Sequence, residues 1–241
     1  HYQSVADLPI GMLGEGWRHS LEWYLDVQTN QAALYTGDGR KKVFGKNGSG
    51  GYLPPVEKHW TLEEKTTGYE VGMPGGLYYD FDTNGVLTTI YDAWGNEIKC
   101  AYGTNACLEY ATHSNGRQIV FSNAWHMASD QWRLASISMR DGMSLTFDYS
   151  GDGQFTQVVE QVDANSYTSS YQYADSFLTN RINGAGFEYS FGYESETNGR
   201  HNGKGTHLDV NGYYEHDVEY IYPNLTEVRY SQCETEQIYR Y

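Results

Sequence analysis

The sequence predicts an all-β fold in which tandem antiparallel β-hairpins join into one continuous curved sheet. Three observations support this prediction. A phrase built around Tyr, Asp and Gly recurs along the chain, its copies keep a nearly constant spacing, and patterns typical of helices are scarce. A tandem repeat of this size usually determines the fold, because each copy codes the same supersecondary unit.

The clearest copy of the phrase begins at Tyr79-Asp80. Gly85 can supply the positive φ that a tight turn needs, and Asp80, Asp82 and Asn84 offer side-chain hydrogen bonds to the turn backbone. The β-branched and aliphatic residues 86–90 then favour a strand. Each copy therefore codes a strand, a turn and another strand.

The turns recur at a regular spacing. The pairs Asp141-Gly142, Asp163-Ala164 and Asn183-Gly184 are separated by 22 and 20 residues, and a second turn lies inside each unit. Two turns per unit leave roughly 7 residues for each strand, about 23 Å of extended chain. This length fits an ordinary strand and leaves no room for a helix.

Helix signals are scarce. The chain has 27 Gly and 23 Tyr among 241 residues, and no window of a dozen residues holds a helical apolar stripe without a Gly. Alternation of apolar and polar residues is clear over 143–149 and 187–193. An antiparallel sandwich or barrel is the alternative, but such folds place turns at irregular intervals and do not reuse one turn phrase.

An ordered series of phrases resembles the YD repeat of the RHS-repeat proteins, which include bacterial polymorphic toxins, Tc toxin shells and animal teneurins. The phrases are Tyr79-Asp80…Gly85-x-Leu87-Thr88, Tyr91-Asp92-Ala-Trp-Gly95-Asn96, an opening over 11–22 that contains Trp17, and a first hairpin over 37–44. The residues expected to have structural roles in these hairpins are Trp17, Tyr79, Asp80, Gly85, Tyr91, Asp92, Gly95, Asn96, Asp141 and Gly142. We expect Gly95 and Gly142 to take positive φ, and Trp17 to be buried against the first hairpin.

The resemblance implies the N-terminal part of an RHS core whose sheet winds into a hollow β-shell. Residues 1–75 would form the opening segment with the first hairpins, and 76–241 the YD-repeat hairpins, continuous with the former. A polar inserted loop is expected over 194–217. The chain ends inside strand-like sequence, so we expect it to be a segment of something longer, with further repeats of the same or a neighbouring chain as partners.

The chain is strongly acidic. Its 31 acidic and 16 basic residues give a net charge of −15, which would repel phosphate backbones, so nucleic acid is not an expected partner. No run of eighteen apolar residues exists, so no membrane span is expected. Acidity and abundant Tyr, Gly, Ser and Thr favour a secreted or cell-surface protein.

The three cysteines cannot all pair within the chain. Cys100 and Cys107 flank six residues between strand-like arms, which leaves open a disulfide across a hairpin or two reduced thiols. Cys233 would be free or joined to another chain. Asn47-Gly-Ser49 and Asn224-Leu-Thr226 fit the pattern for N-glycosylation, which matters only in a source that glycosylates secreted proteins.

Two groups of residues match metal-binding patterns in part. Asp80, Asp82, Asn84 and Gly85 match the first half of a calcium loop, with Asp92 as a further ligand, but Tyr91 stands where a bidentate Glu belongs, and a plain turn is favoured. His201, His207 and His216 lie among carboxylates in the acidic loop, but their spacing matches no zinc pattern. No cofactor is expected.

Three function classes follow from these patterns. The favoured one is a structural, non-enzymatic segment that encloses or displays another polypeptide, or builds an extracellular scaffold. The sequence has no nucleophile elbow, no zinc-protease motif and no phosphate loop. The second is a module whose exposed aromatic residues bind a glycan or a cell-surface protein, although aromatic residues that alternate in strands usually pack in a wall. The third is a metal-assisted enzyme with a site between hairpins.

Overall fold

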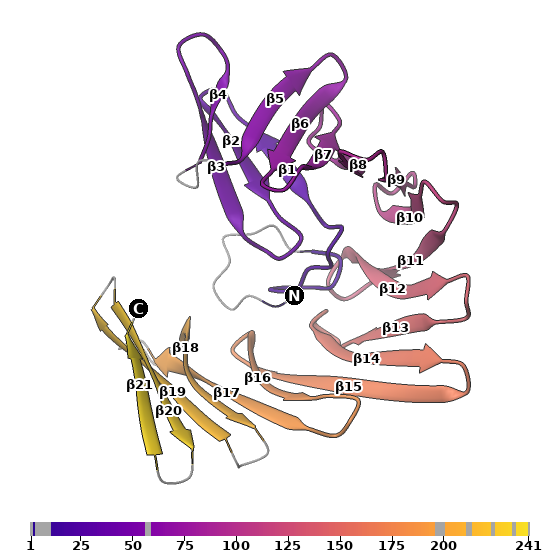
Figure 1. Ribbon diagram of the computed structural model, residues 1–241. Helices are drawn as coiled ribbons and strands as arrows, with labels where there is room; N and C mark the ends of the chain where they lie inside the picture. The colour runs from indigo at the N-terminus through magenta and orange to yellow at the C-terminus, as the bar shows by residue number, and fades with distance from the viewer. Residues whose placement is uncertain are drawn as a thin grey trace. The chain divides into compact units, whose positions relative to one another are not determined.

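The computed structural model describes residues 2, 11–55, 59–195, 201–210, 214–222, 225–232 and 235–240, and the side chains of 2, 11–55, 59–193 and 208–210. Throughout these ranges the regular structure is β-strand, which confirms the predicted all-β fold (Figure 1). In the described parts of the chain no helix is long or apolar enough to cross a membrane. The chain divides into two compact units, one including Leu8–Ser144 and the other including Leu145–Tyr241.

The first unit contains two sheets. A four-stranded sheet has the order β1-β2-β3-β4, and the longer ladder starts at β5, with each strand antiparallel to the next as far as β12. The strands are β1 (Tyr24–Val27), β2 (Gln31–Tyr35), β3 (Lys41–Lys46), β4 (Tyr52–Leu53), β5 (Thr61–Lys65), β6 (Gly68–Met73), β7 (Leu77–Phe81), β8 (Leu87–Asp92), β9 (Glu97–Tyr102), β10 (Leu108–His113), β11 (Gln118–His126) and β12 (Gln131–Met139). The ladder passes residue 75 without a break, because Met73 pairs with Leu77. Strand direction changes progressively from β5 to β12, so the ladder is curved (Figure 1).

The second unit continues with hairpins of the same kind. Its strands are β13 (Ser144–Tyr149), β14 (Phe155–Val162), β15 (Asn165–Ala174), β16 (Phe177–Ile182), β17 (Glu188–Ser195), β18 (His201–Val210), β19 (Tyr214–Tyr222), β20 (Leu225–Gln232) and β21 (Thr235–Arg240). From β14 to β21 every strand is antiparallel to the next. The range 194–217, expected as an inserted loop, therefore carries the strands β18 and β19. Polar residues are compatible with strands whose backbone groups are paired on both sides.

The core of the first unit lies between its two sheets. Leu25, Ala32, Leu34 and Phe44 from the short sheet pack with Leu62, Val71, Tyr79, Phe81 and Leu87 from β5–β8. The opening hairpins were expected to continue the ladder edge to edge, but they form a separate sheet that covers it. The physical reason is burial, because stacking the apolar faces of the two sheets removes both faces from water.

One turn geometry closes most of the described hairpins. In each of these five-residue turns, the N–H of the first residue donates to the carbonyl of the fifth, and the N–H of the fourth donates to the carbonyl of the first. The turns are residues 36–40, 47–51, 82–86, 92–96, 103–107, 113–117, 139–143, 150–154 and 183–187. The fourth residue has positive φ, as in a three-residue hairpin loop with a G1 bulge. Gly95 (φ 85°) and Gly142 (φ 87°) hold this position, as predicted.

The turn at Asn183 corrects the predicted register. Gly184 was expected to form the turn with Asn183, but the residue with positive φ is Gly186, at 84°. The Asn183 carboxamide instead accepts hydrogen bonds from the N–H groups of Ala185 and Phe187, at 3.0 and 2.9 Å. An Asn at the first position of a turn takes this role readily, and this explains why the dipeptide alone misled the alignment.

Candidate functional site

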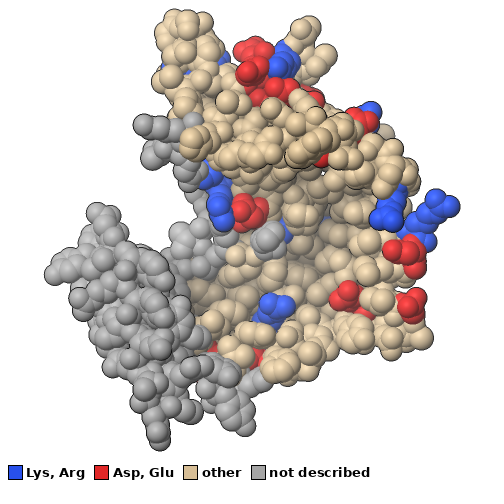
Figure 2. Space-filling model, in the orientation of Figure 1, with Lys and Arg blue, Asp and Glu red and all other residues tan. Residues whose placement is uncertain are grey.

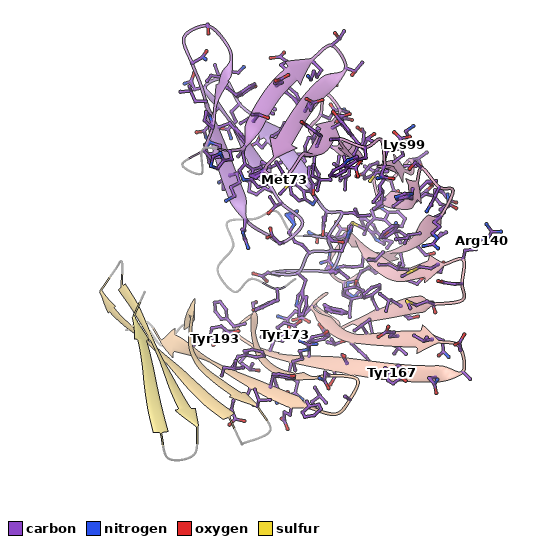
Figure 3. All side chains as sticks on the ribbon, in the orientation of Figure 1. Met73, Lys99, Arg140, Tyr167, Tyr173 and Tyr193 are labelled. Atoms are coloured by element: carbon purple, nitrogen blue, oxygen red, sulfur yellow. The ribbon has the colours of Figure 1, made fainter. Side chains whose placement is uncertain are left out.

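The candidate site is a cavity of about 290 Å³ in the first unit. It is lined by the turn between β2 and β3, the start of β3, the end of β6, the middle of β7, and the segments that precede β1 and β5. We call it the aromatic cavity. Its lining residues are Ser20, Trp23, Thr36, Gly37, Asp38, Arg40, Lys42, Trp60, Met73 and Tyr79. Met73 is labelled in Figure 3.

Aromatic rings form the apolar wall of this cavity. Trp23 stacks on Tyr79 with ring centroids 4.1 Å apart. The Trp23 indole N–H donates to the Ser20 carbonyl at 2.8 Å, which fixes the orientation of the ring. Burial, followed by the nearby Asp38 charge, raises the pKa of Tyr79, so its hydroxyl stays protonated and can donate.

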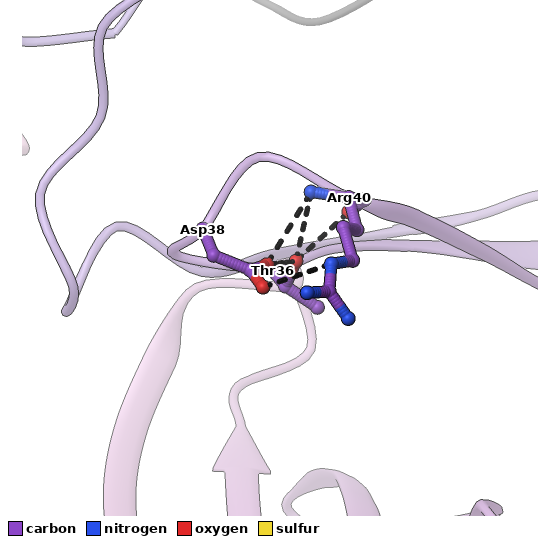
Figure 4. Close-up of polar contacts among 3 residues, drawn as sticks. All are labelled: Thr36, Asp38 and Arg40. Atoms are coloured by element: carbon purple, nitrogen blue, oxygen red, sulfur yellow. Dashed lines mark hydrogen bonds and ion pairs between the residues drawn. The ribbon is translucent and has the colours of Figure 1, made fainter. Parts of the chain in front are cut away.

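The turn Thr36–Arg40 forms the polar wall (Figure 4). Thr36 is buried, and its hydroxyl contacts the Asp38 carboxylate and accepts a hydrogen bond from the Arg40 N–H at 3.0 Å. The Asp38 carboxylate also lies 3.1 Å from the Arg40 Nε. Burial opposes ionisation of Asp38, but hydrogen bonds from Thr36 and Arg40 and the Arg40 charge outweigh it and lower the pKa of Asp38. The cavity therefore presents a fixed carboxylate beside a guanidinium.

Gly37 allows the two walls to meet. A Cβ at this position would lie 2.3 Å from the Ser20 carbonyl oxygen and 2.7 Å from the Trp23 Nε1. Only glycine permits so close an approach of the turn to the chain before β1. The hairpin over 37–44 was expected from its sequence, but its part in a cavity was not, because Trp23, Trp60 and Tyr79 are distant from it in sequence.

The turns of the YD phrases hold their acidic residues in backbone hydrogen bonds. The Asp82 Oδ1 accepts from the N–H groups of Asn84 and Val86, both at 2.9 Å. The Asp92 Oδ1 accepts from the N–H groups of Trp94 and Asn96, at 2.9 and 3.0 Å. Hydrogen bonds, chiefly from Asn96, lower the pKa of Asp92 against a smaller desolvation effect. Both carboxylates therefore act as turn caps.

Asp80 lies on β7, directly opposite Glu70 on β6. Burial, and then the Glu70 charge, raise the pKa of Asp80, while Lys65 opposes this shift. The Tyr91 hydroxyl donates to Glu70 at 2.5 Å. Among the side chains that the structure describes, no group of three or more His, Cys, Asp or Glu is placed to hold a metal ion, so the candidates Asp80, Asp82, Asn84 and Asp92 are not brought together as ligands.

Threonines that follow the turns bridge each hairpin. The Thr88, Thr156 and Thr179 hydroxyls donate to the carbonyls of Asp80, Asp148 and Gln172, at 3.0, 3.2 and 3.2 Å. Each threonine follows a buried residue, namely Leu87, Phe155 or Leu178. The x-Leu-Thr part of the phrase therefore codes a core residue and a hydrogen bond across the strands.

A second bridge links neighbouring strands at register shifts. The Asn123 amide donates to the Leu108 carbonyl at 2.9 Å. The Tyr173 and Tyr193 hydroxyls donate to the carbonyls of Phe155 and Leu178, at 2.5 and 2.6 Å. Each donor lies at a β-bulge, and the two tyrosine rings project from the same face of the sheet (Figure 3). Each bulge lies in the pairing of the donor strand with the strand that follows it, and the donor side chain bonds to a carbonyl of the strand that precedes it.

Other predicted residues have different surroundings from those expected. Trp17 is half-buried rather than buried, and its ring lies 5.2 Å from that of Tyr2. The opening segment also contacts a later hairpin, because the Leu134 N–H donates to the Met12 carbonyl at 2.9 Å.

Cys100 and Cys107 are both free thiols, so the hairpin disulfide is not formed. Cys100 pairs with Ala111 in the ladder, whereas Cys107 closes the turn that begins at Gly103. Three residues along a strand separate the two positions, about 10 Å, which is too far for a disulfide.

Several predicted residues fall outside the described parts of the chain. Cys233 and Asn224 are not described, nor are the side chains of His201, His207 and His216. The backbone pairs His207 with Asp217 and Leu208 with His216. Asn47 is described, and its side chain is exposed and accepts from the Ser49 N–H at 3.1 Å.

Charged groups are sparse on the face in view in Figure 2, where several positive and negative groups lie side by side among uncharged residues. The cations of β3 lie over aromatic rings, with the Nζ atoms of Lys41, Lys42 and Lys46 at 5.3, 5.7 and 5.3 Å from the ring centroids of Tyr35, Trp60 and Tyr52. Lys42 and Trp60 both line the aromatic cavity.

Comparisons with known proteins give few close likenesses. A family model described as a domain of unknown function, DUF6531, matches residues 1–44. A search of curated proteins found no match.

Solved structures with a similar fold include the TcdB2-TccC3 crystal structure, with 10% identity and a TM-score of 0.46 over 87% of this chain and 14% of that one. The Photorhabdus luminescens Tc holotoxin pore with a TccC3 mutation has 10% identity and a TM-score of 0.30 over 86% of this chain and 14% of that one. A porin-like protein from Bacteroides uniformis has 14% identity and a TM-score of 0.35 over 90% of this chain and 91% of that one. The chain thus spans 14% of the length of each of these two Tc toxin chains.

Proposed function

We propose that this chain is a structural segment of a β-sheet wall that encloses or displays another polypeptide, without chemistry of its own. The observation that carries the proposal is the recurrence of one hairpin design. The same turn closes successive hairpins, and the threonine bridge recurs at Thr88, Thr156 and Thr179.

This design suits a wall because each hairpin offers its neighbour the same edge. Strands β6 to β11 are paired on both sides, so each pair of neighbouring hairpins repeats the same backbone contacts. Stability in such an array comes from neighbour contacts and can extend over any number of copies. Further hairpins of the same or a neighbouring chain are therefore the partners that we propose.

Aromatic residues strengthen the stacking of hairpins along the wall. Phe155 contacts Phe147, Tyr149 and Tyr171, with ring centroids 5.8, 5.9 and 4.8 Å apart, across neighbouring strands. Each such pair contributes about 0.5 to 1.5 kcal/mol beyond area burial. With a net charge of −15, the wall would stay soluble outside the cell or at its surface, where we place it.

Electron cryo-microscopy of the purified protein, together with any polypeptide that copurifies, tests the proposal. A wall predicts thin curved density around a space or in a laterally joined array. An enclosed polypeptide should resist trypsin until urea opens the wall, whereas the same polypeptide added from outside should be digested at once. A solid particle without a sheet-like wall would contradict the proposal.

A further inference from the structure

Four cations gather on one strand of an otherwise acidic chain. Arg40, Lys41, Lys42 and Lys46 lie on or beside β3, whereas the whole chain has a net charge of −15. Two of them, Arg40 and Lys42, line the aromatic cavity. The cavity therefore combines positive charge with aromatic rings, and the proposed structural function does not require this combination.

The two cations are placed to bind an anionic group. The Arg40 side chain is 68% exposed, and its Nε pairs with Asp38 at 3.1 Å. In Figure 4 the dashed line from Asp38 ends on the Nε, and no dashed line joins either terminal nitrogen of the guanidinium to Thr36 or Asp38. Lys42 adds an ammonium group near the same opening, 5.7 Å from the Trp60 ring centroid. A guanidinium binds a carboxylate through two parallel N–H groups.

A ligand that carries only anionic groups does not suit this cavity, because the Asp38 carboxylate is itself negatively charged. This carboxylate is held ionised by Thr36 and Arg40 and lines the same cavity. A second bare anion beside it would be repelled, whereas a hydroxyl group could donate a hydrogen bond to it. The ligand must therefore carry hydroxyl donors as well as one negative charge.

The apolar wall adds the third requirement. Trp23, Trp60, Tyr79 and Met73 offer ring and thioether surface suited to the C–H groups of a small ring. The volume of about 290 Å³ is just below the range of ligand sites, roughly 300 to 1,000 Å³, so only a small ligand fits. We propose that the aromatic cavity binds an acidic sugar, namely a pyranose that carries a carboxylate.

In this proposal Arg40 and Lys42 bind the sugar carboxylate, Asp38 accepts hydrogen bonds from ring hydroxyls, and the indoles contact the ring. The inference is independent of the wall function, because the hairpins pair without any ligand. A wall that binds no sugar and a sugar-binding protein that builds no wall are both recognisable outcomes.

Calorimetry with three small probes tests the inference on the whole chain. Glucuronate combines a pyranose ring with a carboxylate, glucose lacks the charge, and acetate lacks the ring. We expect saturable binding of glucuronate below about 20 mM, with glucose and acetate each weaker by about tenfold or more. No binding of glucuronate to the folded protein would overturn the proposal, and so would equal binding of acetate or glucose.

Variants then locate the site. Arg40→Gln should weaken glucuronate binding about tenfold or more and leave glucose unaffected, whereas Trp60→Ala should weaken both. Trp94→Ala and Lys99→Gln are matched controls, because Trp94 is 82% exposed and Lys99 lies on another hairpin (Figure 3). Thermal melts of all four variants show whether each is folded. Unchanged affinity in the folded Arg40→Gln variant, or tighter binding of a tetraglutamate peptide than of glucuronate, would contradict an acidic-sugar site.

Discussion

Single glycines decide how closely the hairpins approach their neighbours. Gly85 and Gly142 occupy the same position of the same turn, with φ of 78° and 87°. A Cβ at Gly85 would lie 1.8 Å from the Leu25 carbonyl oxygen, whereas a Cβ at Gly142 would meet nothing within 4 Å. The Leu25 N–H also donates to the Gly85 carbonyl at 2.9 Å. Gly85 therefore joins the short sheet to the ladder, and Gly142 only closes its own turn.

The pair gives a controlled mutational test. Gly142→Ala should cost about 1 to 2 kcal/mol, because an L-residue is strained at positive φ. Gly85→Ala should cost at least about 2 kcal/mol more, because the added methyl group displaces the Leu25 backbone. Urea unfolding of both variants measures the difference. Equal free energies of unfolding would mean that β1 does not pack against the turn at Gly85.

The two described cysteines should be slow to react in the folded protein. Burial raises the pKa of Cys100 to about 11 and also, with the Glu109 charge, raises that of Cys107. Little thiolate exists well below these values, and the thiolate is the reactive species. Alkylation near pH 8, followed by peptide mass spectrometry, should label both residues slowly in buffer and fully in urea. A peptide joined by a disulfide between them would show that the register of β9 and β10 is wrong.

Asp80 should make the fold less stable at neutral pH. Its pKa is raised from 3.8 in the folded state, by burial and then by Glu70, so the folded protein holds this proton more tightly than the unfolded chain. The free energy of unfolding therefore falls as the pH rises from 3.8 through the raised pKa of Asp80, and the destabilisation by Asp80 is complete above that pKa. Asp80→Asn removes the penalty.

We expect Asp80→Asn to raise the urea midpoint at pH 7. It should change the midpoint little at about pH 3, which is below the pKa of Asp80 in both the folded and the unfolded state. Glu64→Gln, at an exposed carboxylate on β5, is the control. A stabilising effect that is the same at both pH values would show that charge is not its cause.

At the scale of the hairpin, side-chain bridges to backbone carbonyls accompany the irregularities of the ladder. The register shifts between Asp80 and Phe81, where the Thr88 hydroxyl bonds to the Asp80 carbonyl at 3.0 Å. Thr88 and Thr89 are neighbours on β8 and are both half-buried, but only Thr88 makes this bridge among the contacts described.

Replacing each threonine by valine keeps its shape and removes its hydroxyl. Thr88→Val should cost about 1 kcal/mol, because the Asp80 carbonyl loses a partner. Thr89→Val should change the free energy of unfolding by less than about 0.5 kcal/mol. Thermal or urea unfolding distinguishes the two, and an equal loss in both variants would contradict the role of the bridge.

The hairpins could be predicted from the sequence because their signals are local. A Gly at the fourth position marks most of these turns, in several cases after an Asp or Asn at the first position, and an apolar residue followed by Thr specifies the core residue and the bridge. Partner choice between sheets is not local, so the separate sheet β1–β4 was missed. Its strands read as further hairpins, and only the shared burial of Leu34, Phe44 and Val71 decides that they stack on the ladder.

At the scale of the whole molecule, the aromatic cavity could not be predicted at all. Trp23, Asp38, Trp60 and Tyr79 meet there from separate parts of the chain, and no spacing in the sequence relates them. Gly37 was the one available signal, within the phrase Thr-Gly-Asp-Gly-Arg, but it predicts a turn with or without a cavity behind it. Sites that depend on sheet stacking need the structure, whereas repeats do not.

The central claim is that successive hairpins pair edge to edge within each unit. Amide-to-amide nuclear Overhauser effects in the deuterated protein test it most directly, because neighbouring antiparallel strands bring such protons close. The account predicts cross-strand contacts at Tyr78 with Tyr91, Ile90 with Ile98, and Val158 with Ser169. Contacts within single hairpins only, with none between Ile90 and Ile98, would contradict a continuous ladder.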